Sequence, residues 1–382
     1  MSTIGRQSED GARDAASSLR EAGLVHLAPA ATGDAIAATG VLARSLDALD
    51  VPFQISVVRQ PADAARATEA DRTVALGRPS PDADRSLGTD RPASVTAFEV
   101  AQSLDATITE STDVAVLAAA GVVAAGDEPT GALAEALADA DIERRPGVAV
   151  PTDDLADGLA HSTLVHAPFS GDPEATRATL AERDAAEPTD DEARRRVASI
   201  VALTTLDATG ADTRAATAVE DVLRPYAGGP LTTIGGYADV LDAAVRERPG
   251  VAVALALGHD AVTEAALSAW RTHAGRAHDA VRDATVRRHA GLIVAETAGP
   301  TGTVARLLRD FRSPEPLALV ADGDRATLAV TADYDAHAIL DSATTSIDHA
   351  ETVTGDADRA HLTVSGEIET LVATVREVIA DE

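Results

Sequence analysis

Short apolar runs alternate with longer amphipathic segments along this chain. Runs at 24–27, 54–58, 73–76 and 114–123 have the length and composition of buried strands. The segment 36–49 has apolar residues at helical spacing. This alternation is typical of a mostly parallel sheet with helices packed on its faces. We therefore expect an α/β fold.

The chain has 382 residues, which is enough for two domains with separate cores. We expect a polar, mobile tail at 1–18, with residues 14–21 as a candidate start of the first helix, and a parallel-sheet α/β domain at 19–205. A linker at 206–230 includes a Pro- and Gly-rich hinge. A smaller α/β domain follows at 231–382.

Further elements are expected near and within the second domain. A helix over about 190–206 should lead into the linker. In the second domain the apolar runs at 251–257, 292–295, 317–321 and 326–330 predict strands, and 367–379 predicts a final helix.

The charge of the chain is extreme. It carries 62 acidic residues against 32 arginines and no lysine, for a net charge of -30. Dense carboxylates keep a protein hydrated where salt screens charge strongly, so we expect a protein of an extreme halophile. Hydrophobic residues make up 45% of the chain and aromatic residues only 2%, which indicates cores built from Ala, Val and Leu.

Several classes of protein are disfavoured by composition. The absence of cysteine excludes disulfides, thiolate zinc sites and cysteine nucleophiles. The longest apolar runs are far shorter than a membrane span, and no run resembles a signal peptide. We expect a cytoplasmic protein with no membrane partner.

The turn between the run at 23–27 and the helix that contains Ile36 holds a single carboxylate, Asp34. It resembles the metal-binding turn of the DHH family of phosphoesterases, which includes the RecJ single-strand nucleases. Thr32 and Asp34 stand where that family has two aspartates, so the resemblance implies that one carboxylate of the pair remains.

Later segments resemble the same family with further ligands replaced. Ala75 stands where a metal-binding aspartate is expected, and Ala124 or Ala125 stands in place of the last one. The segment 92–100 resembles the helix start after the Asp-His-His triplet, but the preceding residues 78–91 contain no histidine.

The second half of the chain extends this resemblance. Residues 235–246, followed by 250–258, are similar to a segment of archaeal RecJ-like nucleases. Residues 354–364 fall where the DHH-associated domain has a Gly-Gly-His loop for nucleic acid, and Asp356 takes the position of the histidine. The resemblance implies a DHH-like domain followed by a DHH-associated domain.

Hydrolysis by two metal ions requires several carboxylate or imidazole ligands on ions about 3.5 to 4 Å apart. Alanine and threonine cannot replace them. We therefore assign no catalytic residue and expect no cofactor, with Mn or Mg as the metal if activity remains. Asp34 is either a remnant metal ligand or an acid that caps or is solvated at a helix start.

Binding to nucleic acid would normally require a basic stripe, and none is visible. Arg306, Arg309 and Arg312 lie one helical turn apart and are our candidate nucleic-acid contact. The alternative is a helix face paired with nearby acids, as we expect for residues 194–196 after the acids at 190–192. The ten histidines are dispersed, and His273 and His278 are five residues apart, so we expect them at the surface or satisfied in the core.

Two functions follow from these observations. The first is a catalytically inactive RecJ-like factor in DNA replication or repair. The resemblance to the eukaryotic helicase-activating member of the superfamily implies the GINS complex or another replication protein as its partner. The second is a Mn- or Mg-dependent single-strand 5′ to 3′ exonuclease or phosphoesterase. A third alternative is binding of single-stranded nucleic acid without cleavage.

Overall fold

The computed structural model describes residues 3–59, 70–208, 211, 213–345, 353–363 and 368–381. They form two compact units, each made of several stretches of the chain. The first unit comprises residues 1–145, 149–153 and 224–271, and the second comprises 146–148, 154–223 and 272–382. No helix in these described ranges is long and apolar enough to cross a membrane.

The first unit contains a four-stranded parallel sheet in the order β2-β1-β3-β4. Its strands are β1 (Val25–Pro29), β2 (Phe53–Ile55), β3 (Arg72–Leu76) and β4 (Arg85–Leu87). Leu27 lies opposite Ile55 on one side and Val74 on the other. The expected parallel α/β arrangement is confirmed for this unit.

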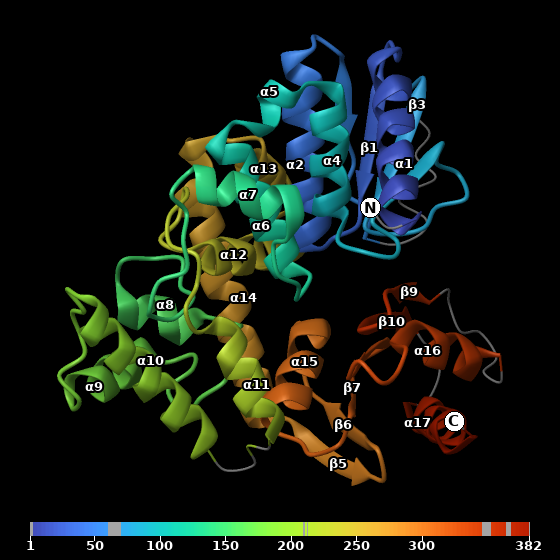
Figure 1. Cartoon of the computed structure of the whole chain (residues 1–382). Helices are drawn as coiled ribbons and strands as arrows, with labels where there is room; N and C mark the ends of the chain where they lie inside the picture. Colours follow the sequence, from blue (N-terminus) through green and yellow to red (C-terminus); the bar gives the residue numbers. More distant parts are fainter. Residues whose placement is uncertain are drawn as a thin grey trace. The chain divides into compact units, whose positions relative to one another are not determined.

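Helices of the first unit form layers on this sheet (Figure 1). The helix α4 packs between α1 and α2 over the sheet face that carries Leu27 and Val74, and α6, α12 and α13 pack against α2 or α4. Their bounds are α1 (Thr3–Arg20), α2 (Gly33–Ala48), α4 (Ala93–Leu104), α5 (Ala106–Thr109), α6 (Thr112–Ala124), α7 (Gly131–Asp139), α12 (Ile234–Glu247), α13 (Pro249–Ala256), the 3-10 turn η1 (Asp260–Val262) and the first part of α14 (Thr263–Asp283).

Small residues set the spacing of these helices. A Cβ atom at Gly121 of α6 would lie 2.6 Å from Ser94 Cβ and 2.7 Å from Ala37 Cβ. At Gly40 of α2 it would lie 2.5 Å from the carbonyl oxygen of Ala256. The helices therefore approach one another closely, which explains how an alanine-rich core with few aromatic residues fills its volume.

The second unit contains a six-stranded mixed sheet in the order β5-β6-β7-β8-β10-β9. Only β6 and β7 pair in parallel; the other neighbours are antiparallel. The strands are β5 (Thr285–His289), β6 (Leu292–Glu296), β7 (Leu317–Asp322), β8 (Arg325–Val330), β9 (Thr354–Gly355) and β10 (Arg359–Thr363).

Apolar residues of β6, β7 and β8 form a core with α16 (Ala336–Thr344) and α17 (Ile368–Asp381), while α15 (Thr301–Phe311) packs separately on β7 and β8. The unit also includes the second part of α14 and four helices from earlier in the chain, α8 (Leu155–His161), α9 (Pro173–Ala181), α10 (Asp191–Leu206) and α11 (Thr213–Val222).

Several expected elements differ from the structure. Residues 3–20 form a helix rather than a tail, because Ala12, Ala15, Ala16 and Leu19 give it a buried stripe of mostly small residues. Two runs that predicted strands, 114–123 and 251–257, lie in α6 and α13. α6 is buried on most sides, and α13 is apolar all round although only Ala252, Leu255 and Ala256 are buried, so the apolar residues of both runs show no helical period.

The division of the chain also differs from the expected continuous domains. Residues 206–230 include helix α11 and are not simply a linker. Residues 231–271 belong to the first unit, because α12 and α13 pack against α2. The strands expected at 292–295, 317–321 and 326–330 and the helix expected at 190–206 are present. Glu367, where we expected the last helix to start, lies outside the described residues.

Candidate functional site

The turn after β1 is closed by a helix cap. Thr32 has extended backbone angles, φ -125° and ψ 154°, and its hydroxyl accepts a hydrogen bond of 3.2 Å from the backbone N–H of Ala35. This is the geometry of an N-cap residue, which satisfies one of the free N–H groups of the first helical turn. The residue at the first aspartate position therefore begins α2.

Asp34 caps a different helix from the one that contains it. Its side chain is buried, with 8% exposed, and points to the first turn of α4. One carboxylate oxygen accepts 2.6 Å from the N–H of Ala93, and the other accepts 2.9 Å from the N–H and 2.5 Å from the hydroxyl of Ser94. Pro92, at the start of α4, provides no side-chain cap. Asp34 supplies the cap from a distant part of the chain.

Burial dominates the electrostatics of Asp34. Removal of the carboxyl group from water raises its pKa above the usual value, and the carboxylate of Asp127 raises it further. The hydrogen bonds from Ser94 and Ala93 lower the pKa but do not cancel the effect of burial. The hydrogen bonds from the first turn of α4 therefore only partly compensate the cost of burying the charged Asp34 carboxylate.

The other positions that the family resemblance singled out lie close to this turn. A Cβ atom at Gly77, just after β3, would lie 3.0 Å from Ala35 Cβ and 3.8 Å from Ala30 Cβ. At Gly33 it would lie 2.9 Å from Ala124 Cβ, at the end of α6. Ala75 is fully buried in β3. The structure therefore brings the turn, the end of β3 and the end of α6 together, and the methyl groups of Ala30, Ala35 and Ala124 lie there beside the Cβ atom of Asp242.

These residues do not fit a magnesium or manganese site. Such ions require several oxygen or imidazole ligands around one point. Within the part of the chain that the structure describes, no group of three or more His, Cys, Asp or Glu residues could hold a metal ion. Both oxygens of Asp34 are already engaged by α4.

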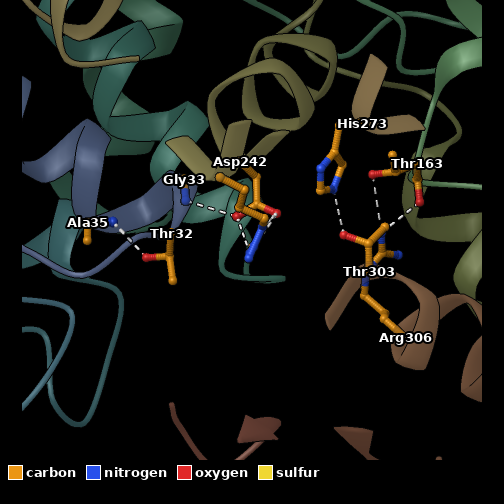
Figure 2. A network of polar contacts seen from close by, with 9 residues as sticks. Thr32, Gly33, Ala35, Thr163, Asp242, His273, Thr303 and Arg306 are labelled. Atoms are coloured by element: carbon orange, nitrogen blue, oxygen red, sulfur yellow. Dashed lines mark hydrogen bonds and ion pairs between the residues drawn. The ribbon is translucent and has the colours of Figure 1, made fainter. Parts of the chain in front are cut away.

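A second carboxylate lies at the start of α2. Asp242 of α12 accepts a hydrogen bond of 3.0 Å from the N–H of Gly33 (Figure 2). Arg246 binds both oxygens of Asp242 at 2.8 and 2.9 Å. A carboxylate is favourable at a helix N-terminus, where free N–H groups concentrate positive charge. Both residues lie in the segment 235–246 that resembles RecJ-like nucleases, and their spacing of four residues is the sequence signal for this ion pair.

The candidate nucleic-acid arginines are largely engaged within the second unit. Arg306 of α15 donates 2.6 Å to the carbonyl oxygen of Thr163 (Figure 2), and Arg309 donates 2.6 Å to Asp310 and also to the carbonyl oxygen of Val330. Arg312 follows the end of α15 and is half-buried. A nucleic-acid contact through Arg306 or Arg309 would have to replace these bonds, and it stays a prediction.

The loop that resembles the Gly-Gly-His segment is a tight turn between β9 and β10. Asp356 accepts 3.0 Å from the N–H of Asp358 and 2.9 Å from the N–H of Arg359. Gly355 has φ 118°, and a Cβ atom there would lie 2.2 Å from the carbonyl oxygen of Arg359. Asp356 therefore shapes the turn. Val364, the last residue of the resembling segment, lies outside the described residues.

One buried histidine pair was missed by sequence reasoning. The Nδ1 atoms of His166 and His278 are 3.0 Å apart, and Nε2 of His278 lies 3.0 Å from the carbonyl oxygen of Ser162. Since a carbonyl only accepts, Nε2 of His278 carries a proton, and its Nδ1 accepts from His166. Burial lowers the pKa of His166 to about 4 and that of His278 to about 3. The residues are 112 positions apart, so no local spacing signalled the pair.

Two comparisons of sequence relate this chain to the same protein. A family model described as "Uncharacterized protein rrnAC1427, C-terminal domain" matches residues 284–377, which include the mixed sheet. The protein rrnAC1427 of Haloarcula marismortui, a halophilic archaeon, is 54% identical over 371 residues, which cover 96% of this chain and 97% of that protein.

Comparisons of structure relate the fold to two kinds of protein. RecJ from Thermus thermophilus in complex with Mn²⁺ has a TM-score of 0.54 at 15% identity, and this chain spans about half of its length, 54%. Exonuclease RecJ bound to manganese has a TM-score of 0.50 at 16% identity, with 97% of this chain and 94% of that chain covered. CDC45 from Entamoeba histolytica has a TM-score of 0.54 at 10% identity, with 97% and 99% covered.

At these identities the solved structures show a shared fold, and the sequence relative shows the family. The described residues therefore have a RecJ- and CDC45-like α/β fold with a mixed-sheet C-terminal domain. The chain belongs to the family of the Haloarcula marismortui protein rrnAC1427.

Proposed function

We propose that this protein is a non-hydrolytic member of the RecJ and CDC45 fold that acts as an interaction factor in DNA replication or repair. One observation carries the proposal. Asp34, the carboxylate that the resemblance places at a ligand position of the turn, has both of its oxygens bonded by the first turn of α4.

The chemistry of the turn supports the absence of hydrolysis. A metal ion at this turn would need Asp34 to release α4, which would leave two buried N–H groups and the Ser94 hydroxyl without an acceptor. It would also need further ligands where the chain places Ala75 and Ala124. Aliphatic side chains neither bind the ion nor lower the pKa of a water molecule.

The similarity to CDC45 supports a role in replication, and the family resemblance of the sequence suggests GINS or another replication protein as the partner. The acidic composition also favours a protein partner over nucleic acid. A net charge of -30 repels a phosphate backbone, and affinity gained from counterion release falls steeply as salt rises.

The alternative function is a Mn- or Mg-dependent exonuclease or phosphoesterase. The specific observation in its favour is the shared fold with RecJ structures that hold Mn²⁺. It requires a set of ligands that the described residues near Asp34 do not offer.

Titration calorimetry with Mn²⁺ in concentrated KCl, combined with hydrolysis of a labelled single strand, tests the proposal. We expect only weak Mn²⁺ binding from surface carboxylates, equal in the wild type and in Asp34→Ala, and no turnover. Micromolar Mn²⁺ affinity and strand hydrolysis that both disappear in Asp34→Ala would establish the enzyme instead.

The partner is tested separately by sedimentation of the full chain with purified GINS complex from a haloarchaeon in concentrated KCl. A salt-resistant co-sedimenting species supports the interaction role. If the two proteins sediment independently at every concentration, GINS is not the partner, and the outcome of the metal test is unaffected.

A further inference from the structure

Two leucines are exposed on one face of helix α10. Leu203 has 54% and Leu206 has 40% of its surface exposed. Among the described residues, the other large hydrophobic side chain exposed to this degree is Val286 of β5. The buried face of α10 is formed by other residues, Val197, Ile200, Val201 and Thr205. The two leucines therefore lie outside the face that packs within the unit.

The exposed leucines belong to an uncharged stretch. Residues 197–206 contain ten consecutive uncharged residues in a chain of which 25% is charged. Ser199, one turn before Leu203, is also exposed. An exposed apolar patch on a highly charged surface commonly marks a contact with another molecule.

Charges of opposite sign lie at the two ends of this stretch. Arg195 and Arg196 are exposed one turn before Ser199, and Asp207 is exposed directly after Leu206. Arg196 also donates 3.2 Å to the carbonyl oxygen of Asp184 and lies 3.9 Å from Glu192, so Arg195 is the main source of positive charge at this end. Asp207 is at the C-terminal end of α10, where a negative charge is unfavourable for the helix itself. The exposed face, which we name the α10 face, thus runs from basic through apolar to acidic and consists of Arg195, Arg196, Ser199, Leu203, Leu206 and Asp207.

We propose that the α10 face binds the same face of a second copy of this chain in an antiparallel pair. A twofold axis that passes the exposed side of α10, level with Val201 along the helix, would place Arg195 opposite Asp207 of the other copy and Ser199 opposite Leu203. The aliphatic stem of Arg196 would cover Leu206. A surface with basic, apolar and acidic parts in this order is complementary to itself when reversed, which an interface between identical copies requires.

The area and the net charge predict how strong this pair is. A stable interface usually buries about 800 Å² per partner, and one face of a helix of this length is smaller, so the dimer is weak. Each copy carries a charge of -30, which opposes association at low salt. At about 1 M salt the screening length is only about 3 Å, so repulsion between distant charges is largely screened, while the apolar contact and the directly opposed Arg195–Asp207 pairs remain. Dimerisation therefore increases with KCl.

Sedimentation equilibrium of the full chain over a range of KCl and protein concentrations tests this. We expect a monomer–dimer equilibrium that shifts to dimer as KCl rises. Leu203→Gln and Leu206→Gln should each raise the dissociation constant by about tenfold or more, since each removes apolar contact twice. Val286→Gln, at the other exposed hydrophobic residue, should leave it unchanged.

Charge reversal distinguishes a second copy from any other occupant. Asp207→Arg should weaken the dimer although it favours the C-terminus of α10, and adding Arg195→Asp to the same chain should restore it. Circular dichroism confirms that the helix is retained. A protein that is monomeric at all salt and protein concentrations, or a dimer insensitive to Leu203 and Leu206, overturns the proposal. So does a pair of reversals that fails to restore the dimer.

The direction of the pair is measured with cysteines, because the natural chain has none. Chains with Ser199→Cys mixed with chains carrying Leu203→Cys should form a mixed disulfide dimer faster than either forms one alone. Faster linking of Ser199→Cys to itself would mean a parallel pair and would contradict the antiparallel arrangement.

Discussion

The hydroxyl of Ser94 donates a hydrogen bond of 2.5 Å to the carboxylate of Asp34, across 60 residues of sequence. The backbone N–H of the same serine donates 2.9 Å to the same oxygen. This contact joins the turn after β1 to the start of α4, two segments in which the sequence resembles the DHH family. A carboxylate bonded to a helix N-terminus here makes a link that needs no ion.

Replacing Asp34 tests whether this link is structural. Asp34→Ala leaves the N–H groups of Ala93 and Ser94 and the Ser94 hydroxyl buried without an acceptor, so the free energy of unfolding should fall by about 1–3 kcal/mol. Ser94→Ala should cost less, because it removes one donor and leaves the other two bonds. Denaturant unfolding in concentrated KCl measures both. Equal stability of Asp34→Ala and the wild type would contradict the structural role.

A second carboxylate gives an independent test at the start of α2. Asp242→Ala removes the acceptor of the Gly33 N–H and the partner of Arg246, whose side chain is only 18% exposed. We expect a loss of about 1–3 kcal/mol in unfolding free energy. Asp10→Ala is the matched control in the same unit, because the Asp10–Arg13 pair is exposed and should contribute less than about 0.5 kcal/mol. Similar effects of the two substitutions would count against Asp242 as a cap of α2.

The strands were more predictable than the site. The run at 73–76 is short and bounded by polar residues, and it forms most of β3. The run at 114–123 is ten residues long and rich in alanine, which favours a helix, but burial on most sides removes the periodic pattern. Length and alanine content would have been the better guide there.

The role of Asp34 could not be predicted from local sequence. A carboxylate in the first turn of a helix usually caps that helix or is solvated, and both were our alternatives to a metal ligand. Its partners, Ala93 and Ser94, come from α4, which follows the three strands β2, β3 and β4. The sequence predicts no ligand at Ala75 and Ala124, whereas the bonds of Asp34 depend on how the helices pack.

The buried histidine pair predicts sensitivity to acid. Both imidazoles are neutral in the folded protein, with pKa values of about 4 for His166 and about 3 for His278, while an unfolded histidine titrates near 6.5. Below that value the unfolded chain binds protons that the folded one does not, so the stabilisation present above pH 6.5 decreases as pH falls towards 4. Arg282, Arg312 and His161 face the pair and oppose its protonation.

Unfolding in denaturant at several pH values between about 7 and about 4 measures this decrease. The double variant His166→Leu with His278→Leu removes both titrating groups and should flatten the pH dependence in this range. His259→Gln, at an exposed histidine, should not change it. If the unfolding free energy of the double variant fell with pH as steeply as that of the wild type, other groups would cause the decrease.

The arginines of α15 allow the nucleic-acid prediction to be separated from a structural role. Arg306→Gln removes a charged donor from the carbonyl oxygen of Thr163 and should lower the unfolding free energy by about 1.5–3 kcal/mol. If Arg306 instead contacts phosphate, its removal should weaken single-strand binding and reduce the salt slope of affinity by about one.

Fluorescence anisotropy with a labelled single strand at several KCl concentrations measures this salt slope, with Arg312→Gln for comparison. Because Arg306 is bonded within the unit, we expect the change in stability without a change in salt slope, and the reverse result would place nucleic acid on α15.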